Sequence, residues 1–146
     1  MTLDGRPIDI LLVEDDPGDE LITREAFERN KIKNTLHVAR DGEQGLDFLY
    51  KRGEFADAPR PELILLDLNL PKYDGRQLLE QIKGDADLCH IPVVVLTTSA
   101  AEEDILKSYK LHANAYVTKP VDVDQFMSAV RQIDEFFVQV VKLPQS

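Results

Sequence analysis

Short, almost wholly apolar segments alternate along the chain with longer segments of helical period, and this alternation allows few folds. Residues 63–66 (LILL) and 93–96 (VVVL) contain no polar side chain, and residues 8–13 turn apolar after a mixed start. Residues 35–39 and 115–118 are shorter and rich in β-branched or aromatic side chains. Strands that are apolar throughout are typical of a parallel sheet that helices cover on both faces.

The segments between these strands carry apolar residues at the spacing of amphipathic helices. They cover residues 17–30, 41–52, 74–83, 99–111 and about 122–141. Asp16 stands at the N-cap position of the first helix, and we expect Gly53 to end the second. The order is therefore βα repeated five times, which predicts an α/β fold of the flavodoxin-like type, (βα)5, with a doubly wound, five-stranded parallel sheet. We expect two helices on one face of this sheet and three on the other.

The chain has the size and charge of a single acidic domain. We expect residues 1–146 to form one domain with a core over about 8–140 and an extended last helix. The net charge of −10 argues against nucleic-acid binding, and no apolar run approaches the ~20 residues of a membrane span. No secretory signal opens the chain, and the single cysteine, Cys89, excludes an internal disulfide framework. We therefore expect a cytoplasmic protein that binds neither nucleic acid nor membrane.

Polar side chains stand where the predicted strands end. Glu14 and Asp15 follow the first strand, Asp67 the third, Thr97 the fourth and Lys119 the fifth. In open α/β sheets the functional site lies outside the carboxyl ends of the strands, where the strand order reverses. We therefore expect these carboxylates, the hydroxyl and the ammonium to meet in one site.

Carboxylates brought together in this way repel one another. Two unit charges about 4 Å apart cost about 4 kcal/mol at an effective dielectric constant near 20. A hard divalent cation relieves this repulsion, and oxygen ligands with room for water suit Mg²⁺. An aspartate beside both a metal ion and a lysine is suited to attack phosphorus, because its neighbours neutralise the phosphoryl oxygens. The site therefore predicts an aspartyl phosphate.

Four segments in this order resemble the receiver domain of two-component response regulators, and the resemblance covers roughly residues 8–140. They are residues 11–16 (LLVEDD), 65–71 (LLDLNLP) with 74–75 (DG), 92–97 (PVVVLT) and 116–120 (YVTKP). The resemblance implies that Asp67 is the phosphoacceptor. It also implies that Asp67, Asp15 directly, Glu14 through water and the backbone carbonyl of Asn69 hold Mg²⁺.

The resemblance assigns roles to the later motifs as well. Thr97 would be the switch hydroxyl that reaches for the phosphoryl group, and Lys119 would contact another phosphoryl oxygen. Tyr116 would turn inward when Thr97 moves. The peptide bond between Lys119 and Pro120 would be cis. The protein would be a phosphoacceptor, not an enzyme, that supports its own Mg²⁺-dependent phosphorylation and dephosphorylation, and phosphodonors would be its only small-molecule substrates.

Other features are similar to single-domain regulators that partner bacterial phytochromes. They include residues 14–19 (EDDPGD), the loop around 60–61, residues 96–99 (LTTS) and the apolar end of the last helix. The partner would be a histidine kinase, such as a phytochrome, in a light-sensing pathway. That helix end also favours a homodimer, with a contact surface that includes Phe136, Phe137, Val140 and Leu143. The chain ends without a DNA-binding or enzymatic domain, so we expect output through phosphorylation-dependent protein contact.

Several other interpretations stay open at this stage. The chain could be a phosphorelay intermediate for another kinase. A phosphatase of the haloacid dehalogenase type also uses an aspartate nucleophile, but it needs a second aspartate two residues on, where Asn69 stands here. A flavin-binding flavodoxin needs a phosphate loop after the first strand, and Glu14 and Asp15 would repel phosphate. Tyr116 could equally be a core aromatic residue.

Overall fold

The five strands form one all-parallel sheet in the order β2-β1-β3-β4-β5. The computed structural model describes residues 7–29, 33–70, 74–97, 113, 115–119 and 123–128. The strands are β1 (Ile8–Val13), β2 (Asn34–Ala39), β3 (Leu63–Asp67), β4 (Val93–Thr97) and β5 (Ala115–Thr118). Both the predicted strands and the predicted doubly wound topology are confirmed. The order reverses between β1 and β3, since β2 lies on the outer side of β1.

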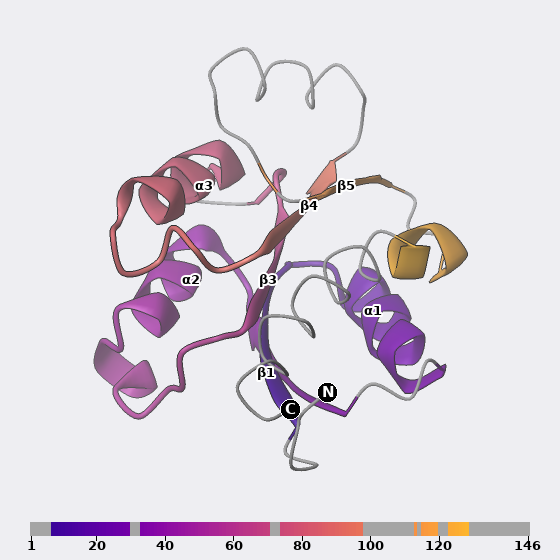
Figure 1. Cartoon of the computed structure of the whole chain (residues 1–146), viewed down its shortest axis with the longest axis horizontal. Helices are drawn as coiled ribbons and strands as arrows, with labels where there is room; N and C mark the ends of the chain where they lie inside the picture. Colours follow the sequence, from indigo (N-terminus) through magenta and orange to yellow (C-terminus); the bar gives the residue numbers. More distant parts are fainter. Residues whose placement is uncertain are drawn as a thin grey trace, which may run out of the picture.

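Helices cover both faces of the sheet (Figure 1). They are α1 (Pro17–Arg29), α2 (Gly42–Leu49), the short 3-10 helix η1 (Gly53–Phe55) and α3 (Gly75–Gly84), with further helical residues at 123–128. In Figure 1, α2 and α3 lie on one side of the sheet, and α1 and residues 123–128 on the other. The helix predicted over 99–111 and the end of the last helix lie outside the described residues. None of the helices in the described part of the chain could cross a membrane.

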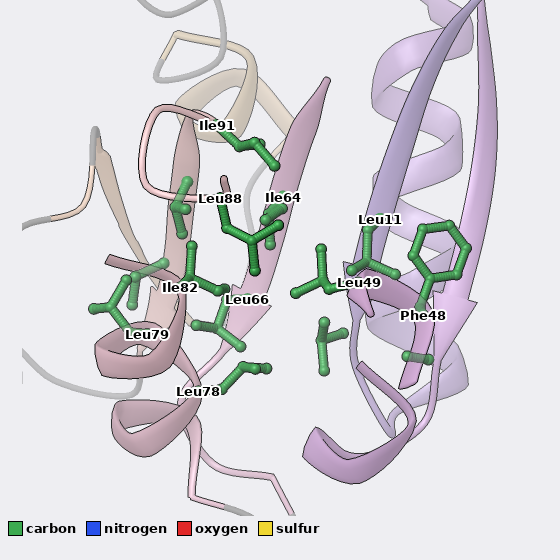
Figure 2. Packing of buried hydrophobic residues seen from close by; sticks show 14 of the residues in the cluster. Leu11, Phe48, Leu49, Ile64, Leu66, Leu78, Leu79, Ile82, Leu88 and Ile91 are labelled. Carbon is green, nitrogen blue, oxygen red and sulfur yellow. The ribbon is translucent and has the colours of Figure 1, made fainter. Parts of the chain in front are cut away.

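Successive side chains of each strand point to opposite faces of the sheet and pack into two separate hydrophobic clusters, one on each face. In the first cluster, Leu78, Leu79 and Ile82 of α3 and Phe48 and Leu49 of α2 gather with strand residues (Figure 2). The second cluster joins the other strand side chains to α1 and to residues 123–128; it includes Ile10, Leu12, Ala26, Phe27, Leu65, Val94, Leu96, Phe126 and Met127. Burying each large apolar side chain contributes about 1.5–3 kcal/mol. The apolar runs of the sequence thus correspond to strands buried on both faces.

The end of α2 differs from the expectation that Gly53 would terminate it. The helix stops at Leu49, and the chain reverses through Lys51, whose φ of 55° is left-handed. The backbone N–H of Arg52 donates to the Asp47 carbonyl at 2.8 Å, and that of Lys51 donates to the Phe48 carbonyl at 3.2 Å. These two bonds form a Schellman motif with lysine at the position that usually carries glycine. Gly53 instead begins η1, also with a positive φ of 58°.

We expect Lys51→Gly to raise the free energy of unfolding by about 0.5–1 kcal/mol, because glycine adopts the left-handed conformation without a Cβ penalty. Part of that gain is offset by the greater freedom of glycine in the unfolded chain. Urea unfolding followed by circular dichroism measures the change. Lys51→Ala is the matched control and should leave stability nearly unchanged, since alanine keeps the Cβ. A less stable Lys51→Gly variant would contradict this account.

Candidate functional site

The polar residues predicted at the strand ends lie along one edge of the sheet. Parallel register pairs Val13 of β1 with Leu66 of β3, so Glu14 and Asp67 follow at the same level. Asp67 pairs in turn with Leu96 of β4, next to Thr97. Because the strand order reverses between β1 and β3, this edge is where α/β sheets place their sites.

Lys119 gathers three carboxylates around one ammonium group. Its Nζ lies 3.0 Å from Asp67 Oδ2, 3.0 Å from Asp19 Oδ2 and 3.2 Å from Glu14 Oε1. Burial alone would lower the pKa of Lys119, but hydrogen bonds and charges from the three acids raise it above its usual range. The backbone N–H of Lys119 donates to the Thr97 carbonyl at 2.7 Å, which ties this residue to the end of β4.

Asp67 is buried and held from two sides. Lys119 Nζ donates to its Oδ2 at 3.0 Å, and the backbone N–H of Asn69 donates to its Oδ1 at 2.9 Å. Helix α3 begins directly against this segment: a Cβ at Gly75 would lie 2.5 Å from the Leu68 Cα and 2.7 Å from the Asp67 carbonyl oxygen. Glycine at position 75 therefore allows α3 to pack close behind Asp67.

Glu14 is fully buried, which is unusual for a carboxylate. Desolvation by burial, together with the neighbouring Asp67, raises the pKa of Glu14 to about 8, although the charge of Lys119 lowers it. Its Oε2 accepts from the backbone N–H of Asp16 and from Lys119 Nζ, both at 3.3 Å. Its Oε1 accepts no hydrogen bond from any residue that the structure describes. This buried oxygen lies 3.2 Å from the Lys119 ammonium, so the ammonium and a bound cation would compete for it.

Glu14, Asp15 and Asp67 together fit a divalent cation. One carboxylate oxygen from each lies within 4.8 Å of the other two. Asp15 is exposed, so the cluster opens to water, and all-oxygen ligands with room for water suit a hard cation. These three side chains could therefore hold the ion.

The structure describes some of the remaining predicted residues and not others. Thr97 is buried at the end of β4. Tyr116 on β5 is half-buried against the cluster under α2 and α3, and its hydroxyl accepts from the backbone N–H of Ala113 at 3.1 Å. Asn69 is exposed beside Asp67. Pro120, and with it the predicted cis peptide bond, lies outside the described residues, and so do the four residues of the predicted dimer surface.

Sequence reasoning did not assign Asp19 to the site. It lies in the first turn of α1, where acidic residues are commonly explained by the positive end of the helix dipole. The signal that could have revealed it is its spacing. Asp19 follows the Asp16 cap by three residues, almost one helical turn, and so lies on the same side of α1 as this cap.

Comparison with known proteins agrees with this arrangement. The chain matches the family described as response regulator receiver domain over residues 10–131. It is 47% identical to response regulator Rcp1 of Synechocystis sp. over 135 residues, which are 92% of this chain and 92% of Rcp1. The solved Mn²⁺-bound form of Rcp1 superimposes with a TM-score of 0.76, at 46% identity, over 90% of this chain and 94% of that one.

Two further solved structures are similar over most of their length. The bacteriophytochrome response regulator RtBRR is 47% identical with a TM-score of 0.80, over 86% of this chain and 77% of that one. The phosphorylated cyanobacterial phytochrome response regulator RcpA is 44% identical with a TM-score of 0.77, over 92% and 96%. The chain therefore belongs to the response regulator receiver domain family, the phosphoacceptor class of two-component signalling.

We expect Lys119→Gln to bind a divalent cation at least about tenfold more tightly than the unaltered chain. The ammonium and the cation compete for the same carboxylates, and a neighbouring positive charge repels the ion. Calorimetric titration with MgCl₂ or MnCl₂ at constant ionic strength measures the affinity. Lys33→Gln is the control, because it removes the same charge just before β2, at the opposite edge of the sheet. Equal or weaker binding by Lys119→Gln would show that the ammonium does not act on the cation site.

Proposed function

We propose that Asp67 accepts a phosphoryl group from the phosphohistidine of a partner kinase. The observation that carries the proposal is the surroundings of Asp67: it is buried, 3.0 Å from the Lys119 ammonium, and shares a carboxylate cluster with Glu14 and Asp15. We propose Mg²⁺ as the cation, held directly by Asp67, by Asp15 and by the backbone carbonyl of Asn69, and by Glu14 through water. When bound, it neutralises charge on the phosphoryl oxygens.

The transfer step needs positioning more than further chemistry from the protein. An Asp67 oxygen attacks phosphorus, the P–N bond to the kinase imidazole breaks, and the bonding electron pair stays on the imidazole nitrogen. The new P–O bond is a mixed anhydride of carboxylate and phosphate. Lys119 donates to a phosphoryl oxygen as charge develops there. Water attacking the same phosphorus later restores Asp67, so the chain supports its own phosphorylation and dephosphorylation without being an enzyme.

The proposed readout lies beside β4 and β5. The phosphoryl group adds up to about two negative charges and new acceptor oxygens. Thr97 would donate to one of these oxygens and vacate space into which Tyr116 turns. The bond from the Ala113 N–H to the Tyr116 hydroxyl would break in that step, so the turn before β5 would report the change. Output would follow through protein contact at this surface.

A phytochrome-type histidine kinase is the partner that we propose. Relatives similar over most of their length are named as phytochrome response regulators, one of them in phosphorylated form. Passing the phosphoryl group on to another carrier, as a phosphorelay intermediate, is the second role that the same site allows. Histidine kinases use cytoplasmic ATP, so we place the chain in the cytoplasm. We also propose that residues 1–146 form one receiver domain.

Incubation with Mg²⁺ and acetyl phosphate should add about 80 Da to the chain, in a form that hydroxylamine removes. Asp67→Asn should abolish the adduct, because an amide is no nucleophile towards phosphorus. Asp47→Asn is the control, since Asp47 forms a surface ion pair with Arg52. Intact-mass spectrometry measures both. An adduct on Asp67→Asn would show that another residue is the phosphoacceptor. The absence of any adduct on the unaltered chain would contradict the proposal that the chain accepts a phosphoryl group.

We propose that the chain forms a homodimer through Phe136, Phe137, Val140 and Leu143. At about 50 µM the unaltered chain should sediment as a dimer, and Val140→Asp should sediment as a monomer, since a buried unpaired charge opposes association. Leu21→Asp is the control, because Leu21 on α1 is an apolar residue with 65% exposure that this surface does not include. A monomer at this concentration, both with and without phosphorylation, would refute the proposal.

A further inference from the structure

The ammonium of Lys119 has as many donors as it has carboxylate neighbours. A lysine ammonium offers three N–H donors and no acceptor. Asp67 Oδ2 and Asp19 Oδ2 each lie 3.0 Å from Nζ, and Glu14 Oε2 accepts from Nζ at 3.3 Å. A phosphoryl oxygen that needs one of these donors must therefore take it from a carboxylate.

Asp19 differs from the other two acids. It comes from the first turn of α1, and its side chain is 15% exposed, against 1% for Asp67 and 0% for Glu14. It is also not a member of the carboxylate cluster that fits a cation, as far as the described residues go. Its backbone carbonyl accepts from the Thr23 hydroxyl at 2.9 Å, which fixes this turn. Asp19 thus acts on the site through Lys119.

We propose that Asp19 is a positioning residue that holds Lys119 away from the incoming phosphoryl group and so slows phosphorylation of Asp67. The inference rests on the proposed function. Phosphoryl transfer develops charge on the phosphoryl oxygens, and a donor aimed at them lowers the barrier. Hydrogen bonds between charged groups are stronger than those between neutral groups. An N–H group of Lys119 that stays bonded to Asp19 therefore cannot stabilise the phosphoryl oxygens in the transition state.

The step affected is the transfer itself. With acetyl phosphate as donor, an Asp67 oxygen attacks phosphorus, the P–O bond to the acetyl group breaks, and the electron pair leaves with acetate. No proton needs to move. Lys119 exchanges its contact with Asp19 for one with a phosphoryl oxygen. Asp19 is then left with its charge at the partly exposed end of α1, where water and the helix N-terminus can stabilise it.

The test compares initial rates of phosphorylation by acetyl phosphate at saturating Mg²⁺. Asp19→Asn keeps the shape of the side chain but replaces its charge by a neutral acceptor, and it should react about fivefold faster. Asp19→Ser is a second variant that suits a helix N-terminus. Asp16→Asn is the matched control: it removes a charge from the same turn, and its side chain accepts from the Gly18 N–H at 3.0 Å, a cap that asparagine also provides.

Measuring the rates at high salt distinguishes two causes of faster phosphorylation: loss of the contact between Asp19 and Lys119, and weaker repulsion of the anionic acetyl phosphate. At about 0.5 M KCl exposed charges are screened beyond about 4 Å. The proposal requires that the Asp19 variants stay faster there while Asp16→Asn matches the unaltered chain. Rates for folded Asp19 variants that equal or fall below the unaltered rate, or equal acceleration in Asp16→Asn, would overturn it. If the unaltered chain gains no phosphoryl group, the proposed function fails instead.

Discussion

One ammonium group surrounded by carboxylates is the interaction on which the site depends. Lys119 joins β1 through Glu14, β3 through Asp67 and α1 through Asp19, while its own backbone is bonded to β4. Breaking a buried ion pair by removing one partner costs about 3–5 kcal/mol, a large part of the 5–15 kcal/mol that stabilise a typical domain. Asp15 adds a fourth acid, so the acids outnumber the ammonium and the site carries excess negative charge in the resting state.

The sheet explains why these charges meet at all. Its inner strands are buried on both faces, so a polar side chain can be tolerated only where a strand ends. Parallel strands put all such ends at one edge, and the reversed order at β1 and β3 leaves that edge open between helices. The crowding of carboxylates is thus a consequence of topology, and a cation site follows from the crowding.

The same reasoning explains what could be predicted from the sequence. The strands were predicted within one residue because a polar side chain marks each end, as Asp67 and Thr97 do. The end of α2 was predicted wrongly at Gly53, because the left-handed residue is Lys51. Non-local bonds act there, since the Tyr50 hydroxyl donates to Asp85 Oδ2 at 2.7 Å and holds the end of α2 against α3. Such contacts leave no local pattern, and the spacing of Asp19 from Asp16 alone does not reveal its ion pair with Lys119.

A phosphoryl group at Asp67 would bring up to about two more negative charges into a site that already has too many. The proposed Mg²⁺ would offset part of this charge. The negative charge of the phosphoryl group would also attract the Lys119 ammonium. Any movement of Lys119 would act on β4 through the Thr97 carbonyl and on α1 through Asp19. Helix α1 packs on one face of the sheet and Tyr116 on the other. One ammonium group can therefore couple the phosphorylated site to both faces of the domain.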